Sequence, residues 1–488
     1  RFAYKFLPIG IVIGCLLLSY SRGALIAFIG QILLLTILLS RRHAAGSTII
    51  APLRRIASAL CIGFVVFVSA NELRSMLYPV ESATEKITFQ SAEGRSSVDE
   101  RLQFWKHSAL LTLQQPLFGF GPYSFRFVHP QYQQHVLTTS DHPHNLFLKF
   151  SAERGIPAAL LFGCFLFLVL VAGLRLSRSG KRLPESLDSV RLGSALLTTS
   201  VAGTIAHNLI DYNLQFVGIA LPLFLTMGFL LRHAPSFHFV RLPASITGRR
   251  IRNTLACCSL LLLLIALREG WYLVTSSAGR HAEASGNAEA ALGWYKTSSA
   301  EWFSRDLFLS EAHLLLAQGK PDEATASLNR YLTFNSSDAR ALKLKGEIAL
   351  LEDDFESAIA AFHQAFQLAG WNDMGIARGL LEALFAESYQ QPTTNAAADS
   401  RNLALNPEIA LVSPEIERRA RAFADAIEQN LHFVALSPNV EETVKVLIML
   451  SVLYPEKTDE FHSLINTIEQ KASEERMRTR SRPPGFLW

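Results

Sequence analysis

Cysteine is scarce in this chain of 488 residues. Its five copies, Cys15, Cys61, Cys164, Cys257 and Cys258, all lie inside apolar runs. None lies in the polar segments, which excludes a disulfide framework of the kind that holds small secreted domains together. No Cys/His spacing of the zinc-binding type occurs either. The polar parts of the chain are therefore not expected to depend on disulfides or on a cysteine-based zinc site.

Charged residues make up only 18% of the chain, and they are nearly absent from seven apolar runs in its first 275 residues. A helix needs ~18–20 apolar residues to cross a bilayer. The runs cover residues 4–20, 24–39, 56–70, 156–174, 192–210, 216–231 and 255–274. The second, third and sixth are short for a span. We expect an all-α fold in which residues 1–275 form a polytopic transmembrane helical bundle.

The net charge of +4 is mild, but the basic residues gather in three short loops between the apolar runs. These residues are Arg41, Arg42, Arg54 and Arg55; Arg175, Arg178, Lys181, Arg182 and Arg191; and Arg232, Arg241, Arg249, Arg250 and Arg252. The positive-inside rule places these loops in the cytoplasm. Alternation then places the large loop of residues 71–155 and everything after residue 275 on the outer side. Because the charges are spread over short loops, a nucleic-acid-binding patch is disfavoured.

The chain begins Arg1-Phe2-Ala3, without an initiator Met and without the basic, apolar and small-residue segments of a signal peptide. We expect this start to be the cytoplasmic edge of a helix in a longer membrane domain.

The large external loop contains a predicted helix and a predicted turn before its histidine-rich end. Helical spacing predicts a helix over residues 99–115, which carries Arg101 and, four residues later, Trp105. Pro116 ends this helix, and residues 119–122 (GFGP) form a turn. The loop then closes with residues 140–148 (SDHPHNLFL), where His142 and His144 precede the fourth apolar run.

Three sets of residues on the outer side are candidates for chemistry, and each has a simpler reading. Arg22, between two apolar runs, serves either as a ligand for phosphate or as an interfacial anchor. Arg101 either binds phosphate as well or lies on a solvated helix face, where it pairs with Asp99 or Glu100. His144 suits a general base, because the reference pKa of histidine is ~6.5, or it caps structure locally.

A metal site is not expected at this loop. Asp141, His142 and His144 offer three ligands, but no further carboxylate or cysteine cluster in the loop completes a set. Arginine forks bind phosphate in a bidentate manner and stabilise a departing pyrophosphate without a metal. Two arginines and a histidine at a membrane surface therefore indicate glycosyl transfer from a lipid pyrophosphate, with no metal or other cofactor.

A repeat of 34 residues follows the last apolar run. Small residues recur at Ala278, Ala312 and Gly346, and again at Ala290, Ala324 and Ala358, while Trp294, Leu328 and Phe362 keep the same period. Gly319 and Asp353 fall at the turns between paired helices. This pattern is typical of tetratricopeptide repeats, which stack into an α-solenoid, although a generic helical bundle remains an alternative. We assign residues 278–370 to these repeats.

Residues 371–488 keep a helical pattern but lose the period. We expect helices over 416–430, 440–452 and 458–471, a loop over 390–400, and a disordered tail after Arg476.

Several short motifs of the membrane part occur in an order typical of one family. They are residues 21–25 (SRGAL), Arg101 with Trp105, residues 116–125 (PLFGFGPYSF), residues 144–148 (HNLFL) and residues 152–157 (AERGIP). With this order around a single large loop, residues 4–231 resemble the O-antigen ligase/polymerase family of bacterial membrane glycosyltransferases. The chain departs from the family in showing seven spans rather than ten or more, and in carrying repeats.

The resemblance implies a location in the bacterial inner membrane, with the large loop and the repeats in the periplasm. It implies a glycan donor on undecaprenyl pyrophosphate and an acceptor that is a lipopolysaccharide core, a growing polysaccharide or a protein. Arg22 and Arg101 would bind the pyrophosphate and His144 would act as base, with His142 and Asn145 also assigned to substrate. Residues 207–212 (HNLIDY) match the family only loosely, and we interpret them as a polar cluster at a helix end.

Two readings from other classes remain open. The first is a non-catalytic, membrane-anchored assembly scaffold that recruits a protein partner through its repeats. The second is a transporter, which is disfavoured because few ionisable residues lie inside the apolar runs. Arg268 and Glu269 are the main exceptions.

Overall fold

The computed structural model describes residues 7–19, 21–40, 50–77, 97–133, 140–178, 185–233, 248–302, 306–369, 373–390, 407–429 and 439–480. Within these residues the regular structure is helical, so the all-α prediction is confirmed. The chain divides into two units, which we describe separately. The first consists mainly of residues 1–129 and 140–237, and the second mainly of residues 238–480.

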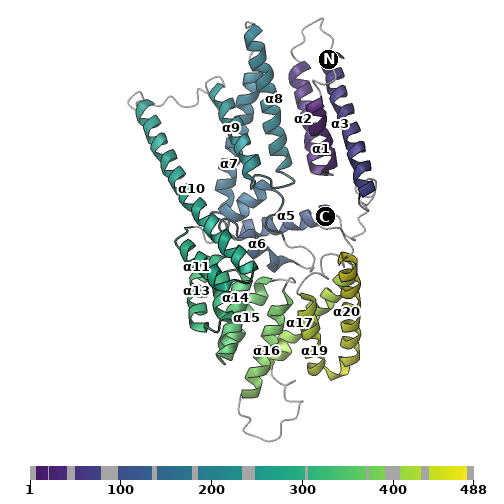
Figure 1. The fold of residues 1–488 in the computed structure, drawn as a ribbon, viewed down its shortest axis with the longest axis vertical. Coiled ribbons are helices and arrows are strands. Elements are labelled where there is room, and N and C mark those ends of the chain that lie inside the picture. Colours follow the sequence, from purple (N-terminus) through teal and green to yellow (C-terminus); the bar gives the residue numbers. More distant parts are fainter. Residues whose placement is uncertain are drawn as a thin grey trace. The chain divides into compact units, whose positions relative to one another are not determined.

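The first unit is a bundle of helices that pack through small residues (Figure 1). Its helices are α1 (Leu7–Leu18), α2 (Arg22–Ser40), α3 (Ile50–Leu77), α5 (Ser97–Gln114), α6 (Phe125–Val128), α7 (Leu146–Arg178), α8 (Glu185–His207) and α9 (Val217–His233), and the 3-10 turn η2 (His129–Tyr132) follows α6. A Cβ on Gly10 of α1 would lie 2.3 Å from Ile62 of α3, and one on Gly173 of α7 would lie 2.3 Å from Thr198 of α8. Such close approach of backbones is typical of helices in membranes, where no hydrophobic effect drives them together.

Each of the seven predicted apolar runs lies on a helix, the seventh on α10 (Gly248–Ala284) of the second unit. Three helices are long and apolar enough to cross a membrane by length and composition, over residues 22–39 in α2, 146–177 in α7 and 250–284 in α10. Helices α1 and α9 and residues 57–73 of α3 are shorter apolar helices. The full count of seven spans therefore stays a prediction.

The second unit is a series of packed helices that begins with α10 and ends with α20 (Figure 1). After α10 come α11 (Ala288–Ser298), α12 (Leu307–Ala317), α13 (Pro321–Phe334), α14 (Ala339–Leu351), α15 (Phe355–Ala369), α16 (Met374–Gln390), α17 (Pro407–Gln429), α19 (Asn439–Leu453), η4 (Pro455–Lys457) and α20 (Thr458–Arg480). Ala312, Ala324 and Ala358 are fully buried, as the 34-residue period requires. Phe362 of α15 packs on two glycines, since a Cβ on Gly346 would lie 2.7 Å from its ring and one on Gly379 would lie 2.4 Å from it.

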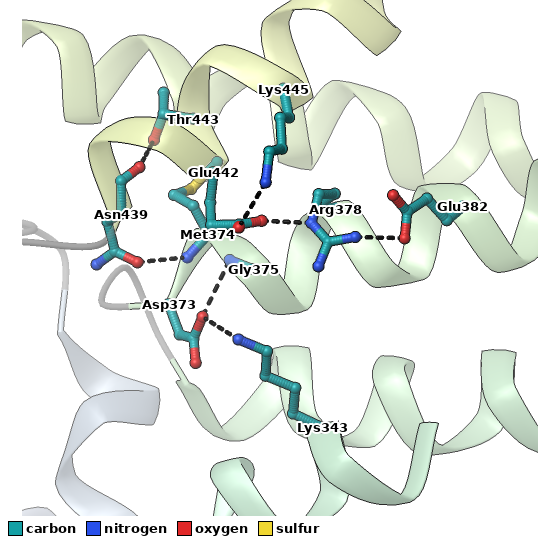
Figure 2. A network of polar contacts seen from close by, with 10 residues as sticks. All are labelled: Lys343, Asp373, Met374, Gly375, Arg378, Glu382, Asn439, Glu442, Thr443 and Lys445. Carbon is teal, nitrogen blue, oxygen red and sulfur yellow. Dashed lines mark hydrogen bonds and ion pairs between the residues drawn. The ribbon is translucent and has the colours of Figure 1, made fainter. Parts of the chain in front are cut away.

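The helical stacking continues beyond the repeats into the C-terminal segment. One hydrophobic core runs from α14 to α20 and includes Leu342, Phe362, Leu447 and Phe461. A polar network joins three of these helices, α14, α16 and α19 (Figure 2). In it Lys343 of α14 pairs with Asp373 at 3.4 Å. Arg378 of α16 pairs with Glu442 of α19 and with Glu382 of its own helix.

The C-terminal helices differ from their predicted bounds at one informative place. Helix α20 continues to Arg480, so residues 477–480 are helical where we expected a disordered tail to begin. Charged residues dominate this last stretch, and the hydrophobic pattern that predicted the helix had already ended. Residues 391–400, predicted as a loop, and residues 481–488 lie outside the described residues.

Candidate functional site

The site is built on a break in helix α7. Gly155 has φ 83° and ψ 164°, so the helix is interrupted there and resumes at Ile156. Pro157 explains the position of the break, because it has no N–H to donate to the carbonyl of Glu153. The freed carbonyls find other donors: Ala152 O accepts from the Phe120 N–H at 3.0 Å and Glu153 O accepts from the Gly121 N–H at 2.9 Å.

The turn after α5 therefore docks on this break and depends on glycine. A Cβ on Gly155 would lie 2.1 Å from Leu117 O, and a Cβ on Gly119 would lie 2.4 Å from Arg154 N. Both glycines also have φ values in the left-handed region that other residues adopt with strain. Two of the short motifs that we singled out in the sequence, residues 116–125 and 152–157, thus form one structural unit.

A buried ion pair lies next to this turn. The carboxylate of Glu153 accepts from the Phe125 N–H at 3.4 Å, and Lys149 Nζ lies 3.3 Å from Glu153 Oε1. Lys149 also lies over the rings of Tyr123 and Tyr212, at 4.7 Å from each. Both charged side chains are almost fully buried, so removal of one would leave the other as an unpaired buried charge.

Asn145 holds the start of α7 against residues 207–212. Its Oδ1 accepts from the N–H groups of Phe147 and Leu148, both at 3.0 Å, so it caps the helix. Its Nδ2 donates to Leu209 O at 2.7 Å. The Leu146 N–H adds a second link, to Asn208 O at 2.8 Å. Both functional groups of the Asn145 side chain are thus engaged within the protein, and its predicted contact with substrate stays a prediction.

His144 is held in an unusual backbone conformation and bonded to Asp211. Its φ is 50°, a value that is uncommon outside glycine and that is often retained where function requires it. Its Nδ1 lies 3.0 Å from Asp211 Oδ1, and both side chains are a little over one quarter exposed. Burial by itself would raise the pKa of Asp211. The hydrogen bonds from His144 and from the Tyr212 N–H, together with the charges of His144 and Arg101, instead lower it to about 2.

This pairing decides which nitrogen of His144 can act as a base. An ionised carboxylate only accepts hydrogen bonds, so Nδ1 carries the proton and donates it to Asp211. In the neutral ring the lone pair then lies on Nε2, which is 3.4 Å from Ser140 Oγ. Ser140 Oγ donates its proton to His142 O at 2.6 Å. Nε2 is therefore left as the basic atom of the site.

His142 lies between aromatic neighbours and stays neutral. Its ring centroid is 4.9 Å from that of His144 and 5.2 Å from that of Tyr212. Burial, together with electrostatic interactions with His144 and Lys149, lowers the pKa of His142 to about 4. A neutral imidazole can donate or accept a hydrogen bond at this place without adding charge.

The structure brings together three possible metal ligands at these histidines. The candidate ligand atoms of His142, His144 and Asp211 lie within 4.8 Å of one another, one short of the four ligands of a structural zinc site. The carboxylate is Asp211 rather than Asp141, which we had considered from the sequence and which is exposed. Asp211 is already bonded to His144, and the positive charges of Arg101 and Lys149 act on this group of residues.

Two other helices reach the neighbourhood of Asp211. Arg22 begins α2, and the Ala24 N–H donates to Ser21 Oγ at 3.2 Å. A Cβ on Gly23, the residue after Arg22, would lie 2.7 Å from Ile210, the neighbour of Asp211. Arg101 lies on α5, close enough for its charge to lower the pKa of Asp211. His144, Arg101 and the start of α2 that carries Arg22 thus lie near residues 207–212.

An aromatic cluster packs behind the histidine. The ring of Phe104 stacks on that of His144 at 6.2 Å and meets His129 edge-on at 5.5 Å, while Phe125 stacks on His129 at 4.6 Å. His129 is completely buried. Burial, followed by the positive charge of His107, lowers the pKa of His129 to about 3, so this ring is neutral.

Sequence reasoning missed the second half of this site. Asp211 and Tyr212 had been assigned to a polar cluster at a helix end, and Lys149 had no assigned role. The available signal was a carboxylate that ends an apolar run on the same predicted side of the membrane as His144. Nothing in the local pattern indicated that the two side chains would touch.

Comparison with known proteins identifies a family over part of the chain. The family model described as O-Antigen ligase matches residues 7–163, which include Arg22, Arg101 and His144, whereas Asp211 and the repeats lie beyond it. The family resemblance predicted from the motifs is thus confirmed over this segment, and it indicates a membrane protein of the glycosyltransferase type. No curated protein sequence matches the chain. A solved structure titled "Crystal structure of MamA protein" is similar over 42% of this chain and 94% of that chain, at 14% identity and a TM-score of 0.25.

Proposed function

We propose that this protein transfers a glycan from undecaprenyl pyrophosphate to an acceptor at the periplasmic face of the bacterial inner membrane. The observation that supports the proposal is that His144, Arg101 and the start of α2 at Arg22-Gly23, from three separate parts of the chain, approach residues 207–212. Residues 1–275 hold the transferase, residues 278–370 form its repeats, and residues 371–488 are a helical C-terminal extension. The basic loops between the apolar runs support the orientation.

In the proposed reaction, an acceptor hydroxyl attacks the anomeric carbon of the donor sugar. A new C–O bond forms while the bond from the anomeric carbon to the pyrophosphate oxygen breaks, and the pyrophosphate leaves with that electron pair. His144 Nε2 takes the proton of the attacking hydroxyl, and Asp211 stabilises the imidazolium that results. His142 and Asn145 complete the acceptor side, His142 by hydrogen bonding and Asn145 by fixing the position of His144.

Arg22 and Arg101 bind the pyrophosphate in this proposal. Planar guanidinium groups match phosphate oxygens in a bidentate manner and stay charged at every relevant pH. Their charge stabilises the negative charge that develops on the leaving group, a role that metal ions perform in other transferases. The proposed reaction therefore uses no metal and no cofactor.

The test is glycan transfer in a strain that lacks the protein and is complemented with full-length protein. His144→Ala is compared with wild type and with His233→Ala, a histidine at the exposed end of α9, at matched membrane levels. We expect His144→Ala to abolish transfer and to accumulate lipid-linked glycan, and His233→Ala to behave as wild type. Unchanged transfer in His144→Ala would overturn the proposal.

The solenoid supports a second candidate function, a scaffold that recruits a protein partner. Stacked helix pairs form extended binding surfaces, and here they continue from α10 to α20. Full transfer by a protein with both His144→Ala and Arg101→Ala would favour this role, as would specific capture of an envelope protein by residues 278–488 that is lost when the repeats are altered. The same segment also suits recognition of a protein acceptor.

A further inference from the structure

Helix α10 is too long to lie wholly inside a membrane. Its candidate span covers Arg250–Ala284, 35 residues. At 1.5 Å per residue it is about 52 Å long, against a hydrocarbon core of about 30 Å. Part of the helix must therefore project from the bilayer.

The packing of α10 shows which part projects. Leu260, Leu262, Leu264 and Leu267 are between 55% and 66% exposed, although they point in different directions around the helix. Burial against the rest of this unit begins at Glu269. The apolar stretch that ends at Leu267 thus suits lipid on all sides, and the stretch from Glu269 onward belongs to the solenoid.

Helix α11 runs back along the projecting part toward the lipid-facing part. A Cβ on Gly279 would lie 2.5 Å from the ring of Tyr295, and nearer the span Thr275 Oγ1 lies 2.6 Å from Ser298 Oγ. The order of these contacts along the two helices makes them antiparallel. The loop after α11 consequently returns to the level of α10 at which the exposed leucines end.

Two charged residues of α10 hold this loop. Arg268 donates to Ala300 O and pairs with Glu269, and the Trp302 N–H lies 3.3 Å from Glu269 Oε2. The Arg268 guanidinium also stacks over the rings of Trp302 and Tyr272, at 4.5 and 4.8 Å. Arg268 and Glu269, which stood out in the sequence as ionisable residues in an apolar run, thus fix a loop rather than line a path through the membrane.

We propose that residues 299–302 lie in the headgroup region of the bilayer and that Trp302 and Trp271 are its interfacial contacts. Both indole rings are 60% exposed, and they lie beside the point where the apolar stretch ends. Tryptophan is enriched at this depth because its ring is apolar and its N–H is polar. The occupant of this surface is the lipid bilayer, which is already next to the preceding turns of the same helix. The solenoid therefore rests on the membrane through a fixed loop instead of hanging from a linker.

The test measures the depth of Trp302 in the full chain reconstituted into phosphatidylcholine vesicles. One protein keeps Trp302 and a matched control keeps Trp294, with the other five tryptophans of each replaced by phenylalanine. Trp294 is 43% exposed and packs beside Gly279, which is eleven residues, or about 16 Å, along α10 from Arg268. With lipids brominated near the headgroup, we expect the fluorescence of Trp302 to fall at least about twofold and that of Trp294 to change little.

Equal quenching of the two tryptophans, or no quenching of Trp302, overturns the proposal. Should the proteins with five replacements fail to fold, single changes in the otherwise native chain give the same answer. Trp302→Phe should then reduce the quenchable fraction of the total fluorescence, and Trp294→Phe should leave it unreduced. The reverse result, or no difference, again overturns the proposal. None of these outcomes depends on glycan transfer.

Discussion

His144 and Asp211 are 67 positions apart in the chain, yet His144 Nδ1 lies 3.0 Å from Asp211 Oδ1. The contact is possible because Asn145 ties the first turn of α7 to Leu209, two residues before Asp211. The same stretch receives Gly23 of α2 and the charge of Arg101 from α5. One short segment after α8 therefore organises the whole candidate site.

The carboxylate of Asp211 is expected to matter through the tautomer of His144. Asp211→Asn keeps the size of the side chain but can also donate to Nδ1, which would move the ring proton to Nε2 and remove the base. We expect transfer to fall by about 10²-fold or more, within the range that general-base catalysis contributes. Glycan transfer by membranes at matched protein levels measures this. Asp211→Glu should restore part of the activity, and a purely structural role for Asp211 would predict no such rescue.

Arg101 is expected to bind phosphate through two parallel hydrogen bonds and not only through its charge. Arg101→Lys keeps the charge but loses bidentate binding, so we expect transfer to fall about 10-fold or more, and Arg101→Gln to be worse. Lys106→Gln, an exposed change on the same helix, is the matched control. The rate is measured against donor concentration in purified protein. Equal activity of Arg101→Lys and wild type would contradict bidentate binding.

Gly155 is expected to tolerate no side chain. Gly155→Ala places a Cβ 2.1 Å from a backbone oxygen at a φ of 83°, so the turn of residues 116–121 has to leave the break. We expect a loss of at least about 3 kcal/mol in stability. The thermal midpoint in detergent measures it, with Gly228→Ala as control because its Cβ meets nothing within 4 Å. A midpoint for Gly155→Ala as high as that of the control would show that the break is not rigid.

The buried His129 is expected to make residues 97–133 less stable in acid. Its folded pKa is about 3, whereas an unfolded histidine titrates at ~6.5. Between these values the unfolded chain binds a proton that the folded chain does not, so stability falls as pH falls through this window, by up to about 1.4 kcal/mol per pH unit. Asp211, whose pKa is lowered to about 2, contributes stability that is lost only as pH falls below ~3.8, so it overlaps only the acid end of this window.

Hydrogen exchange of residues 97–133 at pH 7.5 and 5.5, corrected for intrinsic rates, measures the effect of His129. His129→Phe should flatten the pH dependence, and His233→Phe should leave it as in wild type. An unchanged slope in His129→Phe would assign the acid sensitivity to another group.

Chelation is expected to leave transfer unchanged. The arginines supply the positive charge and Asp211 already occupies Nδ1 of His144, so EDTA should not lower the rate of the purified protein. Metal content by mass spectrometry before and after treatment is the control. A loss of activity that zinc or magnesium restores would contradict the proposal that the arginines act without a metal.

Much of the fold followed from local pattern. The helix that carries Arg101 was predicted over residues 99–115 and spans Ser97–Gln114, and the turn after Pro116 is where expected. The 34-residue period placed Ala312, Ala324 and Phe362 in the core of the second unit. These features depend on residues within a few turns of each other, so the sequence carries them directly. The end of α20 was missed because its last turns have no apolar face to detect.

The candidate site divides in the same way. The sequence determined that Arg22, Arg101 and His144 lie at helix starts or loops on one predicted side of the membrane, because hydropathy and charge fix where spans begin and end. Only the tertiary structure decided that His144 bonds Asp211 and that residues 116–121 fill the break at Gly155. It also decided that Arg268 and Glu269 both contact Trp302. Each of these contacts joins segments whose separation is set by packing between helices, and no local periodicity records which helices will meet.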